Sequence, residues 1–123
     1  MSKHFTLPTI TASGSSGSAT GTGTSVRALS GLLLAIKIVQ AGSPAASTDI
    51  TITTEYGGVT RTLLTLTNNN TASAWYDVRE QTDDVTGTAI SANYTLIPLG
   101  GTVTVAIAQG DANQTCVATF VYE

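Results

Sequence analysis

Apolar and polar residues alternate with a period of two along most of the chain after residue 30. Ile50 and Ile52 are separated by a threonine, and the segment from Ile90 to Leu96 alternates in the same way. A period of two is typical of a β-strand that buries one face and exposes the other. The pattern therefore predicts strands over most of this region.

Residues 32–40 are more apolar than the segments that follow them. Leu32, Leu34, Ile36 and Ile38 fall on one side of an extended chain. A buried helix is the competing interpretation of so apolar a run. The Ile and Val content, the glycine at position 31 and the turn-forming residues 41–44 favour a strand.

Further strands are expected at residues 49–54, 59–67, 72–79, 89–97, 102–108 and 114–122, with turns at 57–58, 68–70, 86–87 and 98–101. Short strands at this spacing indicate a sandwich, a jelly roll or a small barrel. We predict an all-β fold: a single β-sandwich or jelly-roll-like domain of about eight short antiparallel strands. Its expected core is Leu34, Ile36, Ile50, Ile52, Tyr76, Ile90, Leu96, Val103, Val105 and Phe120.

The first 24 residues differ in composition from the rest. Residues 3–11 read as a short extended segment that Pro8 confines to an edge or an arm. Residues 12–24 form a Gly/Ser/Thr tract with the composition of a flexible linker. We therefore expect residues 1–24 to be an N-terminal extended arm and tether, residues 25–123 to be the domain, and Phe5, Leu7 and Ile10 to contact a neighbouring subunit. An ordered loop or a glycine-tolerant edge strand of the domain is the alternative for the tract.

Composition and charge exclude some classes of partner. The chain is 41% hydrophobic and 11% charged, against roughly 25% charged residues in typical soluble domains. The formal charge is −3 and the five basic residues are dispersed, so no nucleic-acid partner is expected. No segment has the roughly 20 apolar residues of a membrane span, and no secretory signal is visible. We expect neither a membrane partner nor export.

Residues that carry chemistry are sparse. His4 is the single histidine and Cys116 the single cysteine, which leaves no catalytic base beside a nucleophile and no cysteine-based zinc site. No Gly-x-Ser-x-Gly turn occurs. We predict no enzyme activity and no cofactor, with Cys116 buried as a small apolar residue.

Four acidic residues, Asp77, Glu80, Asp83 and Asp84, cluster around Arg79. They could supply oxygen ligands to a calcium ion, although they do not match a calcium-binding loop. The other interpretation is a solvated loop. Arg79 is expected to pair with a carboxylate of this chain or of a partner.

Trp75 and Tyr76 are adjacent and must face opposite sides of a strand. Alternation with the flanking residues favours Tyr76 inward and Trp75 outward. Trp75 and Arg79 therefore join the candidate partner-interface residues.

Several stretches in order resemble small structural proteins of tailed bacteriophages, of the capsid decoration or cement type. They are residues 49–53 (DITIT) with 56–58 (YGG), 63–68 (LLTLTN), 75–79 (WYDVR), 84–87 (DVTG), 103–106 (VTVA) and 121–123 (VYE). Where this chain reads Tyr76-Asp-Val-Arg79, the similar proteins often have Tyr-Pro-Arg.

The resemblance implies a virion protein that is made in the host cytoplasm, binds the capsid exterior and stabilises it by bridging capsid subunits. The implied partners are the major capsid protein and further copies of the same chain, as a homotrimer. A ligand- or carbohydrate-binding module of a phage tail or fibre is the alternative. That role calls for exposed aromatic residues on one face or a calcium loop.

Overall fold

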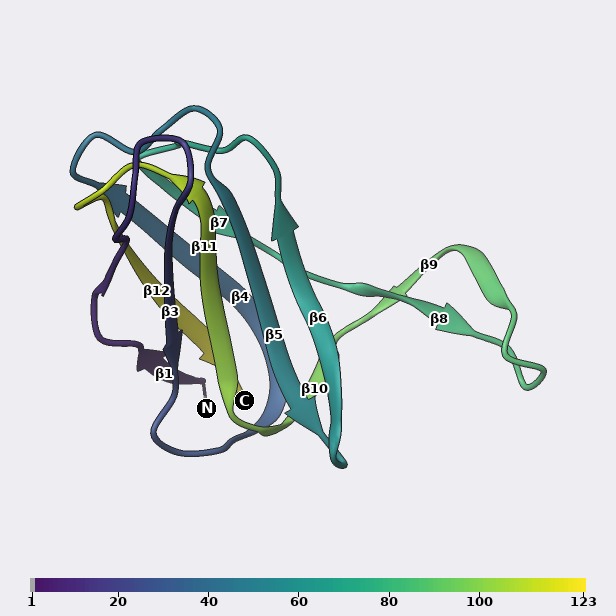
Figure 1. Cartoon of the computed structure of the whole chain (residues 1–123). Coiled ribbons are helices and arrows are strands. Elements are labelled where there is room, and N and C mark those ends of the chain that lie inside the picture. The colour runs from purple at the N-terminus through teal and green to yellow at the C-terminus, as the bar shows by residue number, and fades with distance from the viewer. Residues whose placement is uncertain (1) are drawn as a thin grey trace.

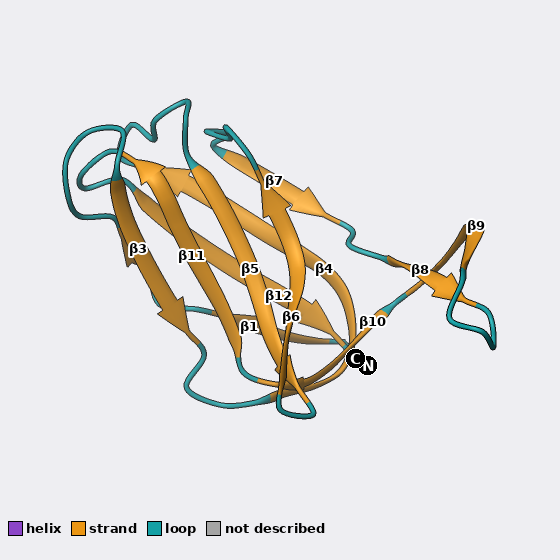
Figure 2. Ribbon diagram, turned by 45° about the vertical axis from the view of Figure 1, so that its right-hand side comes forward, coloured by secondary structure: helices purple, strands orange, loops and turns teal. Residues whose placement is uncertain are grey.

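The computed structural model describes residues 2–123, and this part of the chain contains strands and no helix. Two antiparallel sheets stack face to face, and a third, two-stranded ribbon projects from them (Figures 1 and 2). The strands are β1 (Lys3–Thr6), β2 (Ile10–Thr11), β3 (Ala19–Thr24), β4 (Leu29–Ala41), β5 (Asp49–Tyr56), β6 (Val59–Leu66), β7 (Ser73–Tyr76), β8 (Glu80–Asp83), β9 (Ala89–Thr95), β10 (Ile97–Gly101), β11 (Val103–Gly110) and β12 (Thr115–Tyr122). The predicted all-β sandwich is confirmed, with twelve strands in place of about eight.

The first sheet has β12 and β4 at its centre, and each outer edge is built from two short strands in line. β1 and β2 both pair with β12, and β7 and β10 both pair with β4. Residues 7–9 separate β1 from β2, and the Leu7 amide still donates to the Ala118 carbonyl of β12. At the other edge, the chain leaves the sheet between β7 and β10.

The second sheet has the order β3-β11-β5-β6. Its inner face carries Ile50, Ile52, Val103 and Val105, all fully buried. Its outer face is rich in threonine, which β3 and β5 alternate with inward residues. The hydroxyls of Thr24 on β3 and Thr104 on β11 lie 3.0 Å apart. Threonine suits such a face, since its β-branched side chain fits a strand and its hydroxyl meets water.

The core lies between the two sheets. One row crosses the first sheet from Phe5 on β1 through Phe120 and Ile36 to Tyr76 on β7. Phe120 and Ile36 have no exposed surface, and Phe5 and Tyr76 are partly buried against them. Each large apolar side chain buried here contributes roughly 1.5–3 kcal/mol. Tyr76 faces inward and Trp75 outward, as predicted.

The segment that the sequence predicted to be an arm and tether lies within the sheets. Leu7 and Ile10 are buried in the core, and β3 pairs with β11. The glycines of the tract have a packing reason: a Cβ at Gly23 would come within 2.8 Å of the Ile10 side chain, and one at Gly21 within 3.1 Å. Residues 19–24 of the tract form β3, whose inward glycines leave room for Ile10. This matches the glycine-tolerant edge strand that was the alternative.

The prediction of which β4 side chains face inward is correct over the second half of the strand and wrong over the first half. Ile36 and Ile38 point inward, whereas Leu33 is fully buried and Leu34, a predicted core residue, is only half-buried. The register with β12 moves from Val121 opposite Ala35 to Tyr122 opposite Leu33, so Leu34 is an extra residue. Such a β-bulge reverses the alternation of everything on one side of it.

Two other expectations need correction. Residues 98–101, expected as a turn, lie in β10, where Pro98 is tolerated because β10 is an edge strand. Ile90, expected in the core, is exposed on β9, and Leu96 is only partly buried. The glycine turn at residues 57–58 is confirmed: it joins β5 to β6, with φ angles of 60° and 80°.

Cys116 is buried, as predicted, and burial raises the pKa of its thiol to about 11 from an ordinary 9.0. The unfolded chain therefore loses this proton at a lower pH than the folded chain. The stability that this group contributes is present in full below pH 9 and is lost as the pH rises toward 11. The size of the loss is about 2–3 kcal/mol.

We expect the free energy of unfolding in urea to fall by that amount between pH 8.5 and pH 11 relative to a Cys116→Ala variant measured in parallel. The variant differs from wild type only at position 116, so the difference between the two proteins isolates the thiol. Identical pH profiles for the two proteins would contradict the buried placement of Cys116.

Candidate interaction site

Residues 77–96 leave the first sheet and return to the same edge. Tyr76, the last residue of β7, lies opposite Ile36, and Ile97, the first residue of β10, lies opposite Leu33. Only two residues of β4 separate these positions, yet the chain travels outward through β8 and back through β9 before it returns. The result is a hairpin that projects from the body of the sandwich (Figure 1).

The hairpin is irregularly paired. Glu80 lies opposite Thr95 and Gln81 opposite Tyr94, but the next pair joins Asp83 to Ala89. One residue of β8 therefore faces four residues of β9. Ala92, within this wide bulge, has a φ of 58°, a left-handed conformation that is uncommon for alanine. The Gln81 side chain donates to the Ile90 carbonyl oxygen at 3.0 Å and satisfies one of the displaced main-chain groups.

The tip of the hairpin is ordered by Asp84. Its carboxylate accepts hydrogen bonds from the Thr86 hydroxyl at 2.6 Å, the Thr86 amide at 2.8 Å and the Thr88 amide at 3.1 Å. These bonds, the Thr86 hydroxyl first among them, lower the pKa of Asp84. Gly87 completes the turn with a φ of 80°. The tip therefore has a defined shape although it is exposed to solvent.

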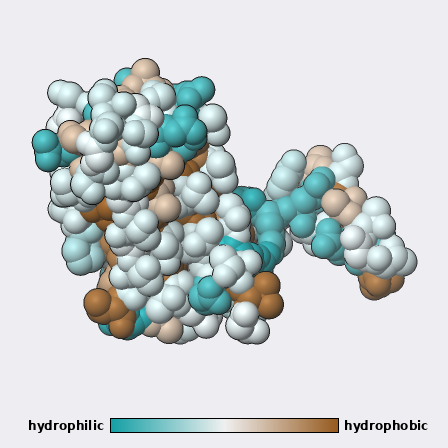
Figure 3. Space-filling model, viewed as in Figure 1, coloured by the Kyte–Doolittle hydropathy of each residue, from teal (hydrophilic) through white to brown (hydrophobic). Residues whose placement is uncertain are grey.

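Most of the hairpin surface is exposed, including its apolar side chains. Every residue of β9 is exposed. Val85 at the tip is fully exposed, and Tyr94 is 62% exposed. The space-filling view shows apolar surface on the projecting part, separated from the body by a narrow polar neck (Figure 3). A two-stranded ribbon with neither face covered is marginally stable by itself.

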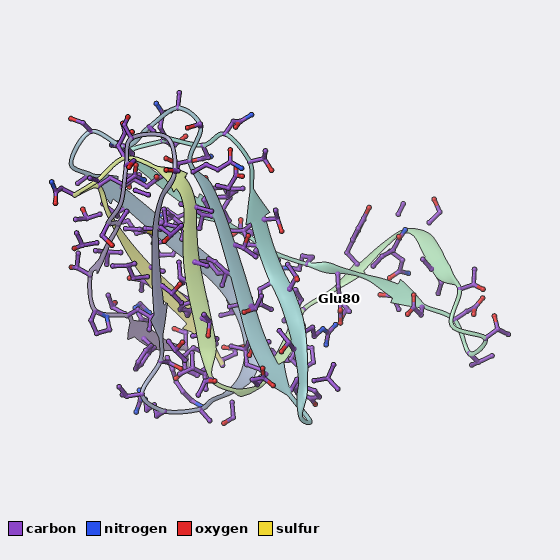
Figure 4. The ribbon with its side chains drawn as sticks, in the orientation of Figure 1. Glu80 is labelled. Carbon is purple, nitrogen blue, oxygen red and sulfur yellow. The ribbon has the colours of Figure 1, made fainter. Side chains whose placement is uncertain are left out.

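Two arginines attach the base of the hairpin to the sandwich. Arg79 donates from Nη1 to the carbonyl oxygen of Leu34, the bulged residue of β4, at 2.9 Å, and to that of Val78 at 2.8 Å. Arg61 on β6 forms an ion pair with Glu80 (Figure 4). The expectation that Arg79 would pair with a carboxylate of this chain is therefore wrong, because the carboxylate beside it is taken by Arg61 and Arg79 instead binds main-chain oxygens at the bulge.

We expect Arg79→Ala and Arg61→Ala to loosen the hairpin with little effect on overall stability. The Arg61 and Glu80 side chains are about one-third exposed, and such a pair contributes about 0.2–1 kcal/mol. Spin labels at Thr65→Cys and Thr88→Cys would report the distance between β6 and the tip, since buried Cys116 stays unlabelled. The distance distribution should broaden in both variants and stay unchanged in the control Lys37→Ala; a constant width in all three would contradict the anchoring role.

The candidate partner-interface residues are not gathered in one place. Leu7 and Ile10 are in the core, and Phe5 is partly buried with the Arg27 guanidinium 5.1 Å from its ring centre. Trp75 is 54% exposed on the outer face of the first sheet, where the Lys37 ammonium lies 5.6 Å from its ring centre. Of this group, Arg79 lies at the base of the hairpin and Trp75 lies on β7, just before it in the chain.

The projecting hairpin itself was not predicted. Ile90 and Tyr94 were interpreted as one strand of the sandwich because they alternate with polar residues. Residues 79–84 contain no apolar side chain that could reach a core. This is the feature of the sequence that indicates a segment outside the sandwich.

Within residues 2–123, no group of three or more histidine, cysteine or acidic side chains is placed to hold a metal ion, and no pocket is found. The acidic cluster is instead divided between the Arg61 ion pair, the Asp84 turn and two exposed carboxylates. His4 is exposed on β1. The described residues include no helix that could cross a membrane.

No protein-family model matches this sequence, and no curated protein matches it. Two solved structures are similar to the chain. A mutant of the carbohydrate-binding module CBM29-2 is 10% identical with a TM-score of 0.41, covering 99% of this chain and 85% of the other. Murine APRIL is 16% identical with a TM-score of 0.42, covering 98% of this chain and 100% of the other. At such low identity, neither similarity transfers a partner to this chain.

Proposed function

We propose that this protein is a structural component of a bacteriophage virion, which binds the outer surface of the capsid and stabilises it by bridging capsid subunits. The observation that carries the proposal is the projecting β8–β9 hairpin. It exposes Val85, Ile90 and Tyr94 on a ribbon that the sandwich does not cover. The sequence resemblance to capsid decoration proteins supplies the kind of partner.

The hairpin has the physical properties that such a contact needs. Burial of its apolar side chains against another protein would contribute roughly 25 cal/mol for each Å² removed from water. The turn around Asp84 is already hydrogen-bonded, so less conformational freedom is lost on binding. The role requires rigidity and contact area, and no catalytic group takes part in it.

Co-sedimentation with capsid particles that lack the protein tests this function. Wild-type protein should pellet with the particles and raise their resistance to heat. The informative variant replaces residues 77–96 by a Gly-Ser linker. Two residues suffice because Tyr76 and Ile97 pair with Ile36 and Leu33 of the same strand. This variant should fold, with a circular dichroism spectrum still dominated by β-sheet, and should no longer pellet.

A matched control is Val59→Ser, which removes an exposed apolar side chain from the β5–β6 turn and should leave pelleting unchanged. Binding by the linker variant equal to that of wild type would refute the hairpin as the contact. Failure of the wild-type protein to pellet with any particle preparation would refute the capsid role.

A carbohydrate-binding role is the second candidate, and Trp75 is the observation that favours it. Its ring is exposed on a flat sheet face, and the apolar face of a sugar can pack against such a ring. A glycan array gives the test. Binding that is lost in Trp75→Ala and retained in the linker variant would replace the capsid role with this one.

A further inference from the structure

The hairpin carries the net charge of the whole chain. Residues 77–96 contain four carboxylates and one arginine, which gives −3, and the chain as a whole has a formal charge of −3. The remaining residues hold four basic and four acidic side chains and balance. Asp77 and Asp83 are exposed, and neither forms an ion pair within residues 2–123.

The opposite side of the molecule has exposed cations without carboxylate partners. Lys3 lies with its ammonium 5.4 Å from the Tyr122 ring centre, and Arg27 lies over Phe5. Neither forms an ion pair among the described residues. Val26, next to Arg27, is 90% exposed. We call Lys3, Phe5, Val26 and Arg27 the β1 edge patch.

The two surfaces complement each other but cannot meet within one molecule. The hairpin exposes apolar Val85 and Tyr94 together with carboxylates that form no ion pair. The β1 edge patch exposes an apolar valine together with cations that form no ion pair. β1 pairs with β12 on one side and with no described strand on the other. β7 and β10, from which the hairpin leaves, lie at the other edge of the first sheet. Figure 1 shows the hairpin on the opposite side of the sandwich from β1 and β3.

We infer that the hairpin of one copy docks against the β1 edge patch of a second copy of this chain. The inference rests on the proposed function, in which copies of the chain bridge capsid subunits, and it adds a contact between neighbouring copies. Because the two patches differ, the contact is head-to-tail, and successive copies close into a ring or extend along a row.

Sedimentation velocity of the purified full-length chain tests the inference. Wild-type protein should associate at low ionic strength and dissociate as salt screens the charges. Asp77→Lys combined with Asp83→Lys should weaken the association at least about tenfold, and so should Lys3→Glu combined with Arg27→Glu. The chain carrying all four changes should regain association, because residues 77–96 then hold three basic and two acidic side chains and face two carboxylates on the β1 edge patch. Lys37→Glu, the same change on the outer face of the first sheet, is the control and should have no effect.

A wild-type chain that stays monomeric at every salt concentration would overturn the inference, and so would charge reversals that leave association unchanged or a fourfold variant that is not restored. The outcome is separable from that of the proposed function. A monomeric chain that pellets with particles through its hairpin refutes self-docking alone. A chain that associates as described but never pellets refutes the capsid role alone.

Discussion

Replacement of Phe120 by alanine is expected to lower the free energy of unfolding by about 3–5 kcal/mol. Phe120 has no exposed surface and lies at the centre of the row that joins β1, β12, β4 and β7. Removal of the ring leaves a cavity that β-sheet backbone on both sides cannot close. Since domains are typically stable by about 5–15 kcal/mol, the variant should lie close to unfolding at ambient temperature.

Urea denaturation followed by tryptophan fluorescence measures this loss. Val121→Ala is the matched control, because Val121 is the next residue on the same strand and its side chain lies half-buried on the outer face. The control should lose less than about 1 kcal/mol. Equal losses for the two variants would mean that the sheet faces are assigned the wrong way round.

Gly31→Ala is expected to lower the free energy of unfolding by about 3 kcal/mol, a large effect for the addition of one methyl group. Gly31 has a φ of 130°, a conformation that side chains rarely adopt, and a Cβ there would collide with the main-chain carbonyl of Glu123. The conformational strain costs about 1–3 kcal/mol and the overpacking a similar amount. The pairing of Leu32 with Glu123 should be lost first.

Gly57→Ala separates these two causes. Gly57 also has a positive φ, of 60°, but nothing lies within 4 Å of a Cβ built on it. It should therefore lose about 1–2 kcal/mol from strain alone. Thermal unfolding of the two variants side by side gives the comparison, and a Gly57→Ala variant as unstable as Gly31→Ala would show that backbone collision is not the cause.

The sandwich was predictable where each strand keeps one buried and one exposed face. Ile50, Ile52, Val103 and Val105 were assigned to the core because a period of two describes β5 and β11 along their lengths. The period of two no longer identifies the buried side chains where a bulge interrupts it. The bulge at Leu34 exchanges the two faces of β4, and no local pattern in an all-apolar run records that exchange.

The errors at the N-terminus and in the hairpin have another origin. In β3 the inward positions are glycines that accommodate Ile10, so a packed strand has the composition of a linker. In β9 the alternation of Ile90 with polar residues is real, but the ribbon projects beyond the body and buries neither face. Composition reports which residues are apolar, and long-range contacts decide which of them are covered.

The order of the strands has a consequence for biosynthesis. β12 is made after the other eleven described strands, yet it lies between β1 with β2 on one side and β4 on the other. β1 and β2 therefore remain without their partner strand until the ribosome has translated the residues between β2 and β12. Folding that depends on such distant contacts is slow, and exposed strands attract other chains meanwhile. Yield in cells should therefore depend on chaperones that hold the nascent chain until residue 122 has emerged.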